Sequence, residues 1–169
     1  MPLDPELVQL ARRIRLLVLD VDGVLTDGQL HFGPRGEEFK SFHVRDGAGI
    51  KALLDAGIEV AVISGRDSLA TAARMRELGV RHVRQACGDK RAGLRELLSE
   101  TGIEPGQVAC IGDDVADINM MRMVGLAVAV ADAHPAACDA ARWVTRLPGG
   151  VGAGRELCDL LLDVRKNEG

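Results

Sequence analysis

Short apolar segments alternate along the chain with longer segments of helical spacing. The apolar segments are rich in Val, Ile and Leu, and they lie at residues 16–19, 58–63, 108–111 and 126–130, with a weaker one at 82–83. Each has the length of a buried strand. The segments between them predict helices at 48–56, 68–78, 91–100 and 115–124, with Gly125 as the stop of the last one. This alternation predicts a parallel sheet covered by helices on both faces.

Two segments depart from the alternation. Residues 29–32 and 37–42 have the composition of two strands, and Gly33-Pro34-Arg35-Gly36 between them is a turn sequence, so we expect a β-hairpin at about 29–42 that projects from the sheet. The Gly-rich stretch from residue 148 to 154 predicts a flexible loop, either a plain mobile connection or a cover over substrate, followed by a helix at about 155–164. Its glycine spacing does not fit a dinucleotide-binding motif.

The 169 residues of the chain fit one domain, residues 1–169, with an aliphatic core because aromatic residues make up only 2%. The net charge of −4 argues against a nucleic-acid-binding surface. The four cysteines lack the paired short spacings of zinc sites and are expected to be reduced thiols. No stretch approaches the ~20 apolar residues of a membrane span and residues 1–15 lack the apolar run of a signal peptide, so we expect a cytoplasmic protein without a membrane partner.

Polar clusters follow three of the predicted strands, where ligands bind in parallel α/β sheets. They are Asp20 to Gly28, Ser64-Gly65-Arg66, and Gly112-Asp113-Asp114 with Asp117 one turn on; Lys90 opens the helix between the last two. The Asp-x-Asp-Gly sequence alone is weak, since turns are rich in Asp and Gly. A calcium loop is excluded because Val24 and Gly28 occupy later ligand positions. The three clusters and Lys90, counted together as four clusters in fixed order, nevertheless predict a functional site.

Converging carboxylates repel one another unless a cation lies among them. Oxygen ligands without Cys or His favour magnesium. A cation, the Lys90 ammonium and the Ser64 hydroxyl together suit a phosphoryl group, which Asp20 can then attack to form an aspartyl phosphate. The sequence therefore predicts a magnesium-dependent phosphoryl-transfer site.

The four clusters resemble, in order, the four motifs of the haloacid dehalogenase superfamily, over nearly the whole chain. The resemblance implies that Asp20 is the nucleophile and a magnesium ligand, and that Asp113 is a second ligand. It implies that Asp22 is the general acid and base and binds the metal through its backbone carbonyl. Ser64 and Lys90 complete the catalytic set. Asp114 and Asp117 become supporting carboxylates, although Asp117 is equally well read as an ordinary residue in the first turn of a helix.

A finer resemblance is to the 3-deoxy-D-manno-octulosonate (KDO) 8-phosphate phosphatases. It rests on the segments Asp20–Gly28, Phe42–Gly47, Val128–Pro135 and the Gly-rich loop before Arg155-Glu156. The substrate-binding residues it implies are Asp22, His43, Arg45, Asp46, Gly47, Lys51, Arg66, Arg74 and Lys90. His43 stands where Asn is the more usual residue and is alternatively a structural histidine. Arg66 and Arg74, eight positions apart, are expected on one side of the same helix.

This resemblance implies a capless, Rossmann-like three-layer α/β/α fold and a magnesium-dependent hydrolase that converts KDO 8-phosphate to KDO and phosphate in lipopolysaccharide synthesis. The alternatives are a phosphatase for a nine-carbon keto acid 9-phosphate, of the KDN or sialic acid type, the phosphatase-like domain of acylneuraminate cytidylyltransferases, and a non-catalytic assembly module. A dehalogenase is disfavoured by Asp22 and Asp113. The core elements leave no room for a cap, and all three Phe lie in the hairpin segment. We therefore expect a homotetramer joined through residues 29–42.

Overall fold

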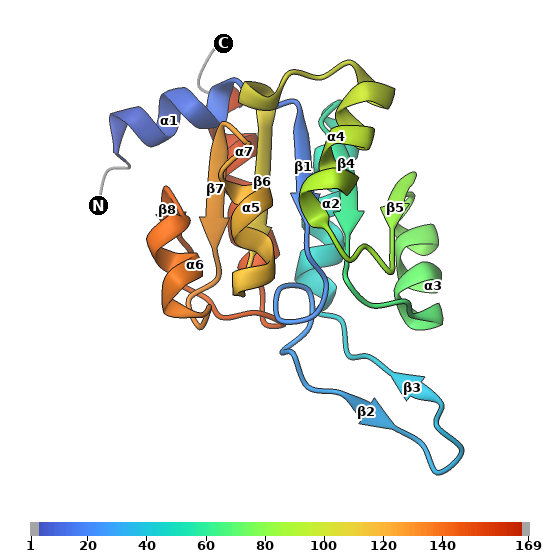
Figure 1. The fold of residues 1–169 in the computed structure, drawn as a ribbon. Helices are drawn as coiled ribbons and strands as arrows, with labels where there is room; N and C mark the ends of the chain where they lie inside the picture. Colours follow the sequence, from blue (N-terminus) through green and yellow to red (C-terminus); the bar gives the residue numbers. More distant parts are fainter. Residues whose placement is uncertain (1–3, 167–169) are drawn as a thin grey trace.

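A six-stranded parallel sheet forms the centre of the molecule, and the computed structural model describes residues 4–166 of the chain (Figure 1). The strand order is β5-β4-β1-β6-β7-β8. The strands are β1 (Leu16–Leu19), β4 (Glu59–Ile63), β5 (His82–Arg84), β6 (Val108–Gly112), β7 (Leu126–Ala129) and β8 (Trp143–Val144). The expected parallel sheet is confirmed.

Helices cover both faces of the sheet, as the alternation predicted. Leu17 and Leu19 of β1 face a core shared with α1 (Pro5–Arg12), α2 (Val44–Asp55), α3 (Leu69–Leu78) and α7 (Ala153–Lys166). Leu16 and Val18 face the opposite core, with α4 (Lys90–Thr101), α5 (Ile118–Met121) and α6 (Pro135–Ala140). Successive side chains of a strand point to opposite faces, so a fully apolar strand supplies both cores. No helix within residues 4–166 is long and apolar enough to cross a membrane.

The strand order places the predicted functional residues at one edge of the sheet. From β1 the chain passes to β4 and β5 on one side, and β6, β7 and β8 add on the other side. Strands β4 and β6 both pair directly with β1. In such sheets the crevice where the strand order reverses lies at the carboxyl ends of the central strands. The residues that follow β1, β4 and β6 are therefore brought together.

The hairpin is present and projects from the sheet, but its paired part is short. Strands β2 (His31–Phe32) and β3 (Glu38–Phe39) pair antiparallel, fewer residues than the ranges expected from sequence (Figure 1). Phe32 and Phe39 are more than half exposed, whereas Phe42 packs against the core. Only two of the three Phe therefore belong to the projecting surface.

The predicted helix at 115–124 is wrong in its length. A 3₁₀ turn at Val115–Asp117 leads into α5, which ends at Met121. Gly125 does not cap this helix: a side chain there would lie 2.2 Å from the carbonyl oxygen of Gly106, and the Gly125 amide donates to Pro105. The glycine is needed for a close approach of two backbones, which local periodicity does not reveal.

The Gly-rich loop is packed where flexibility was expected. The amide of Gly150 donates to the Val24 carbonyl, and that of Gly149 donates to Asp132. A Cβ on Gly149 would lie 1.8 Å from the Gly23 carbonyl oxygen. The glycines allow this loop to lie against the loop after β1, and α7 begins directly behind it, two residues earlier than predicted.

Candidate active site

The loop after β1 is held in a tight turn that presents Asp20 and Asp22. The Thr26 hydroxyl accepts hydrogen bonds from the amides of Gly23 and Gly28. Gly23 has a φ of +88°, and a Cβ there would lie 2.0 Å from an Asp113 carboxylate oxygen. A glycine at this position is therefore what lets the loops after β1 and β6 meet.

Three carboxylates converge where these loops meet. Oxygens of Asp20, Asp113 and Asp117 lie within 4.8 Å of one another. The Lys90 ammonium lies 2.8 Å from Asp20 and 2.5 Å from Asp117. Asp117 is fully buried, and its second oxygen accepts from the amides of Asp113 and Asp114. Asp117 is therefore a support for Lys90 and for the loop, rather than only a residue of the first helical turn.

The charges of this cluster do not balance. Burial and the Asp117 carboxylate raise the pKa of Asp20 to about 6. Burial and the Asp20 and Asp117 carboxylates raise the pKa of Asp113 to about 8. Burial alone would lower the pKa of Lys90, but the charges of Asp20 and Asp117 outweigh it, and Lys90 stays an ammonium. One cation thus faces three carboxyl groups that cannot all ionise easily, and Asp20 and Asp113 fit a hard divalent cation between them.

The pocket above the cluster has a volume of about 330 Å³. It brings together all of the predicted catalytic and metal-binding residues, Asp20, Asp22, Ser64, Lys90 and Asp113, with the supporting residues Asp114 and Asp117 and the predicted substrate residue Arg66. Ser64 is buried at the end of β4, and its hydroxyl accepts a hydrogen bond from the Arg66 amide at 3.4 Å. Exposed Asp114 accepts from the Val115 amide and so begins the 3₁₀ turn. An oxyanion entering the pocket meets a lysine and a serine beside a carboxylate.

The other predicted substrate residues lie away from this pocket within the chain. His43, Asp46, Gly47 and Arg74 line a cavity of about 10 Å³ between α2 and α3. His43 caps α2, since its Nδ1 accepts from the Arg45 amide, which agrees with the structural alternative. Asp46 is buried, accepts from the Arg155 amide at 2.7 Å and holds a second oxygen without a partner among the described residues. Lys51 lies exposed on α2.

The expected alignment of Arg66 and Arg74 on one helix is wrong. Arg74 lies in α3 and pairs with Glu77 at 2.8 Å. Arg66 precedes the helix, because Ser68 caps it and α3 starts at Leu69. Arg66 therefore turns toward the pocket, where it pairs with Glu38 of the hairpin.

Two hairpin residues at the pocket were missed by sequence reasoning. The Lys40 ammonium contacts the carboxylate of Asp22 and lies 3.1 Å from Glu38. The hairpin was predicted from its turn and its Phe residues, and neither Glu38 nor Lys40 was part of that prediction. Glu38 and Lys40 are two residues apart, with Phe39 between them, so they point to the same face of the strand and Phe39 points to the other. This alternation was the sequence signal for a polar inner face.

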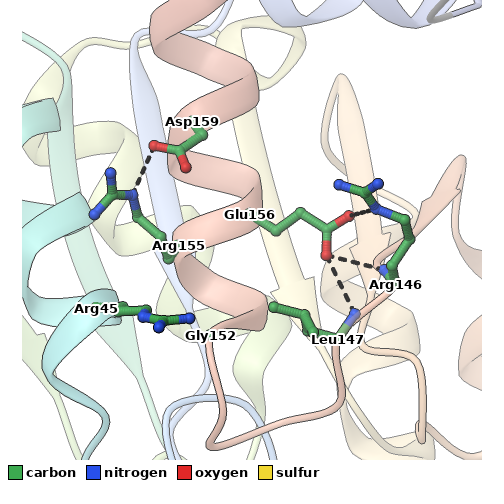
Figure 2. A pocket seen from close by; sticks show the side chains of 7 residues that line it. All are labelled: Arg45, Arg146, Leu147, Gly152, Arg155, Glu156 and Asp159. Atoms are coloured by element: carbon green, nitrogen blue, oxygen red, sulfur yellow. Dashed lines mark hydrogen bonds and ion pairs between the residues drawn. The ribbon is translucent and has the colours of Figure 1, made fainter. Parts of the chain in front are cut away.

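A second pocket of about 610 Å³ lies beside the start of α7, lined by Arg45, Arg146, Leu147, Gly152, Arg155, Glu156 and Asp159 (Figure 2). Its charges are largely paired: Arg146 binds Glu156 at 3.0 Å, and Arg155 binds Asp159 at 2.6 Å. Arg45, from the first turn of α2, extends across toward Gly152 in the same view. Arg45, the remaining predicted substrate residue, therefore lies in this pocket and not in the acidic one.

Comparisons with known proteins agree with this site. A sequence model of the haloacid dehalogenase-like hydrolases matches residues 83–148. The chain is 48% identical over 161 residues to the KDO 8-phosphate phosphatases of Yersinia pestis and of Escherichia coli K12, which covers 95% of this chain and 86% of each relative. The crystal structure of the Yersinia pestis enzyme superposes with a TM-score of 0.96 at 47% identity, covering 98% of this chain and 89% of that chain.

A further solved structure holds ligands. It is the KDO 8-phosphate phosphatase of Moraxella catarrhalis in complex with magnesium ion, phosphate ion and a KDO molecule, with a TM-score of 0.94 and 39% identity over 96% of this chain and 93% of that chain. Identity of this degree over nearly the full length, on one fold and with the four motifs at one sheet edge, shows common descent. The chain belongs to the 3-deoxy-D-manno-octulosonate 8-phosphate phosphatase family of haloacid dehalogenase-like hydrolases.

Proposed function

We propose that this protein is a single capless domain that hydrolyses KDO 8-phosphate to KDO and phosphate, in the synthesis of lipopolysaccharide. The observation that carries the proposal is the cluster of Asp20, Lys90 and Asp113 at one sheet edge, in a chain that is 48% identical to such enzymes over 95% of its length. The Moraxella catarrhalis relative, solved with phosphate and KDO, supports the substrate class.

Magnesium is the cofactor that the site fits. Asp20 and Asp113 would hold it with their carboxylates, and Asp22 with its backbone carbonyl. When bound, the ion offsets the negative charge of the carboxylates and of the phosphoryl oxygens. The donor set offers only hard oxygens, which favour magnesium over zinc. Full activity after exhaustive chelation would contradict this assignment.

Each residue around the pocket has its own role in the proposed reaction. The Asp20 carboxylate attacks phosphorus, the bond to the leaving sugar oxygen breaks, and Asp22 gives that oxygen a proton. Asp22 then takes a proton from the water that cleaves the aspartyl phosphate and restores Asp20. The Lys90 ammonium and the Ser64 hydroxyl bind the phosphoryl oxygens, and both are buried, so water competes little for these contacts. Asp114 and Asp117 hold the loop and Lys90 in place.

The sugar acid would be bound by Arg66 at the pocket and by residues farther away. We propose that His43, Arg45, Asp46, Gly47, Lys51 and Arg74 act on the substrate of a neighbouring subunit or shape the α2 surface that meets it. The support is their place: within one chain they line other cavities or lie exposed on α2. Both placements are consistent with a capless active site that a neighbouring subunit completes.

We propose a homotetramer, formed through the hairpin at 29–42, that works in the cytoplasm. Leu30, Phe32 and Phe39 are 45%, 59% and 58% exposed, which is unusual for apolar side chains gathered on one small projecting element. All four cysteines are free thiols, as expected in a reducing compartment. Interaction with nucleic acid or with membranes forms no part of the proposal.

Phosphate release from a panel of sugar acid phosphates tests the substrate. The panel contains KDO 8-phosphate and the 9-phosphates of KDN and of a sialic acid, each with magnesium and with excess chelator. We expect the highest kcat/KM for the eight-carbon substrate. Preference for a nine-carbon substrate would replace the first proposal by the alternative, and no phosphate release from any of them would indicate an assembly module.

A further inference from the structure

The Lys40 side chain is buried although much of the hairpin is exposed. It is only 2% exposed, while Phe39 beside it is 58% exposed. The ammonium contacts Asp22 in the loop after β1, eighteen positions earlier in the chain. An ammonium is costly to take out of water unless it is paired. The hairpin therefore directs Lys40 inward through specific partners.

The partners of Lys40 form a closed ring of four charges. Lys40 contacts Oδ1 of Asp22, and Arg66 lies 4.0 Å from Oδ2 of the same carboxylate. Glu38 joins the two cations, since one of its oxygens lies 3.1 Å from Lys40 and 3.3 Å from Arg66. Both oxygens of Asp22 thus face a cation, and the carboxylate is held from two sides.

This arrangement restricts a side chain that must be well placed. A carboxyl group that serves in proton transfer has to reach the leaving oxygen within hydrogen-bond distance. The Asp22 side chain is partly exposed, so packing alone does not fix its rotamer. The cation at each oxygen supplies the missing restraint.

We propose that Lys40 is a positioning residue, which acts through Asp22: Lys40 holds one oxygen of the Asp22 carboxyl group and so directs the other, proton-carrying oxygen toward the leaving oxygen of the substrate. Glu38 holds Lys40, and the hairpin thereby contributes to the chemistry of its own subunit as well as to assembly. The inference rests on the role of Asp22 given under the proposed function.

Lys40→Met tests the inference by its dependence on the leaving group. With KDO 8-phosphate, whose sugar oxygen must be protonated as it leaves, we expect kcat/KM to fall on the order of 10–100-fold, part of the roughly 10²–10⁴-fold that acid catalysis contributes. With p-nitrophenyl phosphate, whose phenolate leaves without a proton, we expect a loss below about threefold, because kcat/KM reports the first phosphoryl transfer. Equal losses on both substrates would overturn the inference in favour of a structural role.

A double-mutant cycle supplies a second measurement on KDO 8-phosphate. If Lys40 acts through Asp22, Lys40→Met in an Asp22→Asn background changes kcat/KM by less than about twofold, because the group it orients is already lost. Additive losses would overturn the inference. Arg95→Met, at an exposed position of α4 outside the hairpin, is the matched control and is expected to match the parent on both substrates.

Glu38→Gln keeps the inference testable if Lys40→Met is poorly folded. It leaves Lys40 in place, removes the charge that holds it, and is expected to give a smaller loss with the same leaving-group dependence. If Asp22→Asn lowers activity while neither hairpin variant does, the inference fails and the proposed function stands. If Asp22→Asn has no effect, the role of Asp22 falls and the inference falls with it.

Discussion

Asp20 is the residue on which the proposed covalent step depends. Asp20→Asn keeps the shape of the side chain and an oxygen for Lys90, but an amide is a poor nucleophile. We expect turnover to fall by roughly 10³-fold or more with the fold intact. Phosphate release and circular dichroism measure the two outcomes. Asp27→Asn is the control, since exposed Asp27 belongs to the same loop and accepts from the Gln29 amide, a bond that the Asn oxygen can also accept. Undiminished turnover in the Asp20 variant would sink the mechanism.

The Asp20 and Asp113 carboxyls make the stability of the metal-free protein depend on pH. Their pKa values, about 6 and about 8, lie above the usual value near 4. Their contribution to stability is therefore present below about pH 4 and is lost as the pH rises toward 8. We expect the Tm in excess chelator to fall over this range by more than it does with magnesium. Parallel pH profiles with and without the metal would contradict this.

Asp113→Asn distinguishes the effect of the Asp113 charge on stability from its role in binding magnesium. At pH 8 without metal, we expect the variant to be more stable than the parent by on the order of 1 kcal/mol, which is a rise in Tm of about 2–4 °C. At pH 5 the difference in stability between the variant and the parent should be smaller. Added magnesium should no longer raise the Tm of the variant. Asp114→Asn, which retains a capping oxygen for Val115, is the control and should keep the response to magnesium.

At the scale of elements, the Gly-rich loop before α7 supports the loop after β1. Gly149→Ala places a methyl group where the Gly23 carbonyl lies, 1.8 Å away, so one of the two loops must move. We expect a loss of about 1–3 kcal/mol in stability and a lower kcat, because Gly23 belongs to the loop of Asp20 and Asp22. Gly106→Ala is the control, since a Cβ there meets nothing within 4 Å. If the Gly149 variant has the same melting temperature as the Gly106 control, the Gly-rich loop can move without loss of stability and the prediction is wrong.

Element boundaries were predictable where a single local signal decided them. Strands β1, β4, β6 and β7 lie within a residue of the apolar segments, because a fully buried parallel strand is apolar throughout. Helix α1 was missed, although Leu7 and Ala11 are buried. The short elements α6 and β8 hold too few residues for a periodic pattern, so only their packing defines them.

For the whole molecule, the exposed hairpin predicts assembly. We expect Phe32→Glu and Phe39→Glu, separately and together, to lower the mass measured by light scattering from that of a tetramer and to lower turnover. Charged side chains at these positions cannot be buried between subunits without a partner. Val144→Glu is the control, because Val144 is 38% exposed on the edge strand farthest from β5 in the sheet order. An active monomer in the parent protein would refute the tetramer.

The sequence by itself determined the fold class, the family and the set of residues at the acidic pocket. This was possible because β1, β6 and β7 are apolar over their full length, β4 is apolar after its first residue, and Asp20, Ser64 and Asp113 directly follow β1, β4 and β6. Parallel strands bring their carboxyl ends to one edge whatever their order, so Asp20, Ser64 and Asp113 could be placed together from local signals.

The tertiary structure alone decided which charges meet across the chain. It placed Lys40 on Asp22, set Arg66 apart from Arg74, and packed the Gly-rich loop against the loop after β1. These contacts join residues that are distant in sequence, so no local pattern of helical or strand spacing indicates them. They depend on the path of the hairpin and on close approaches of two backbones, and the free energy of such contacts belongs to the assembled fold and not to any one segment.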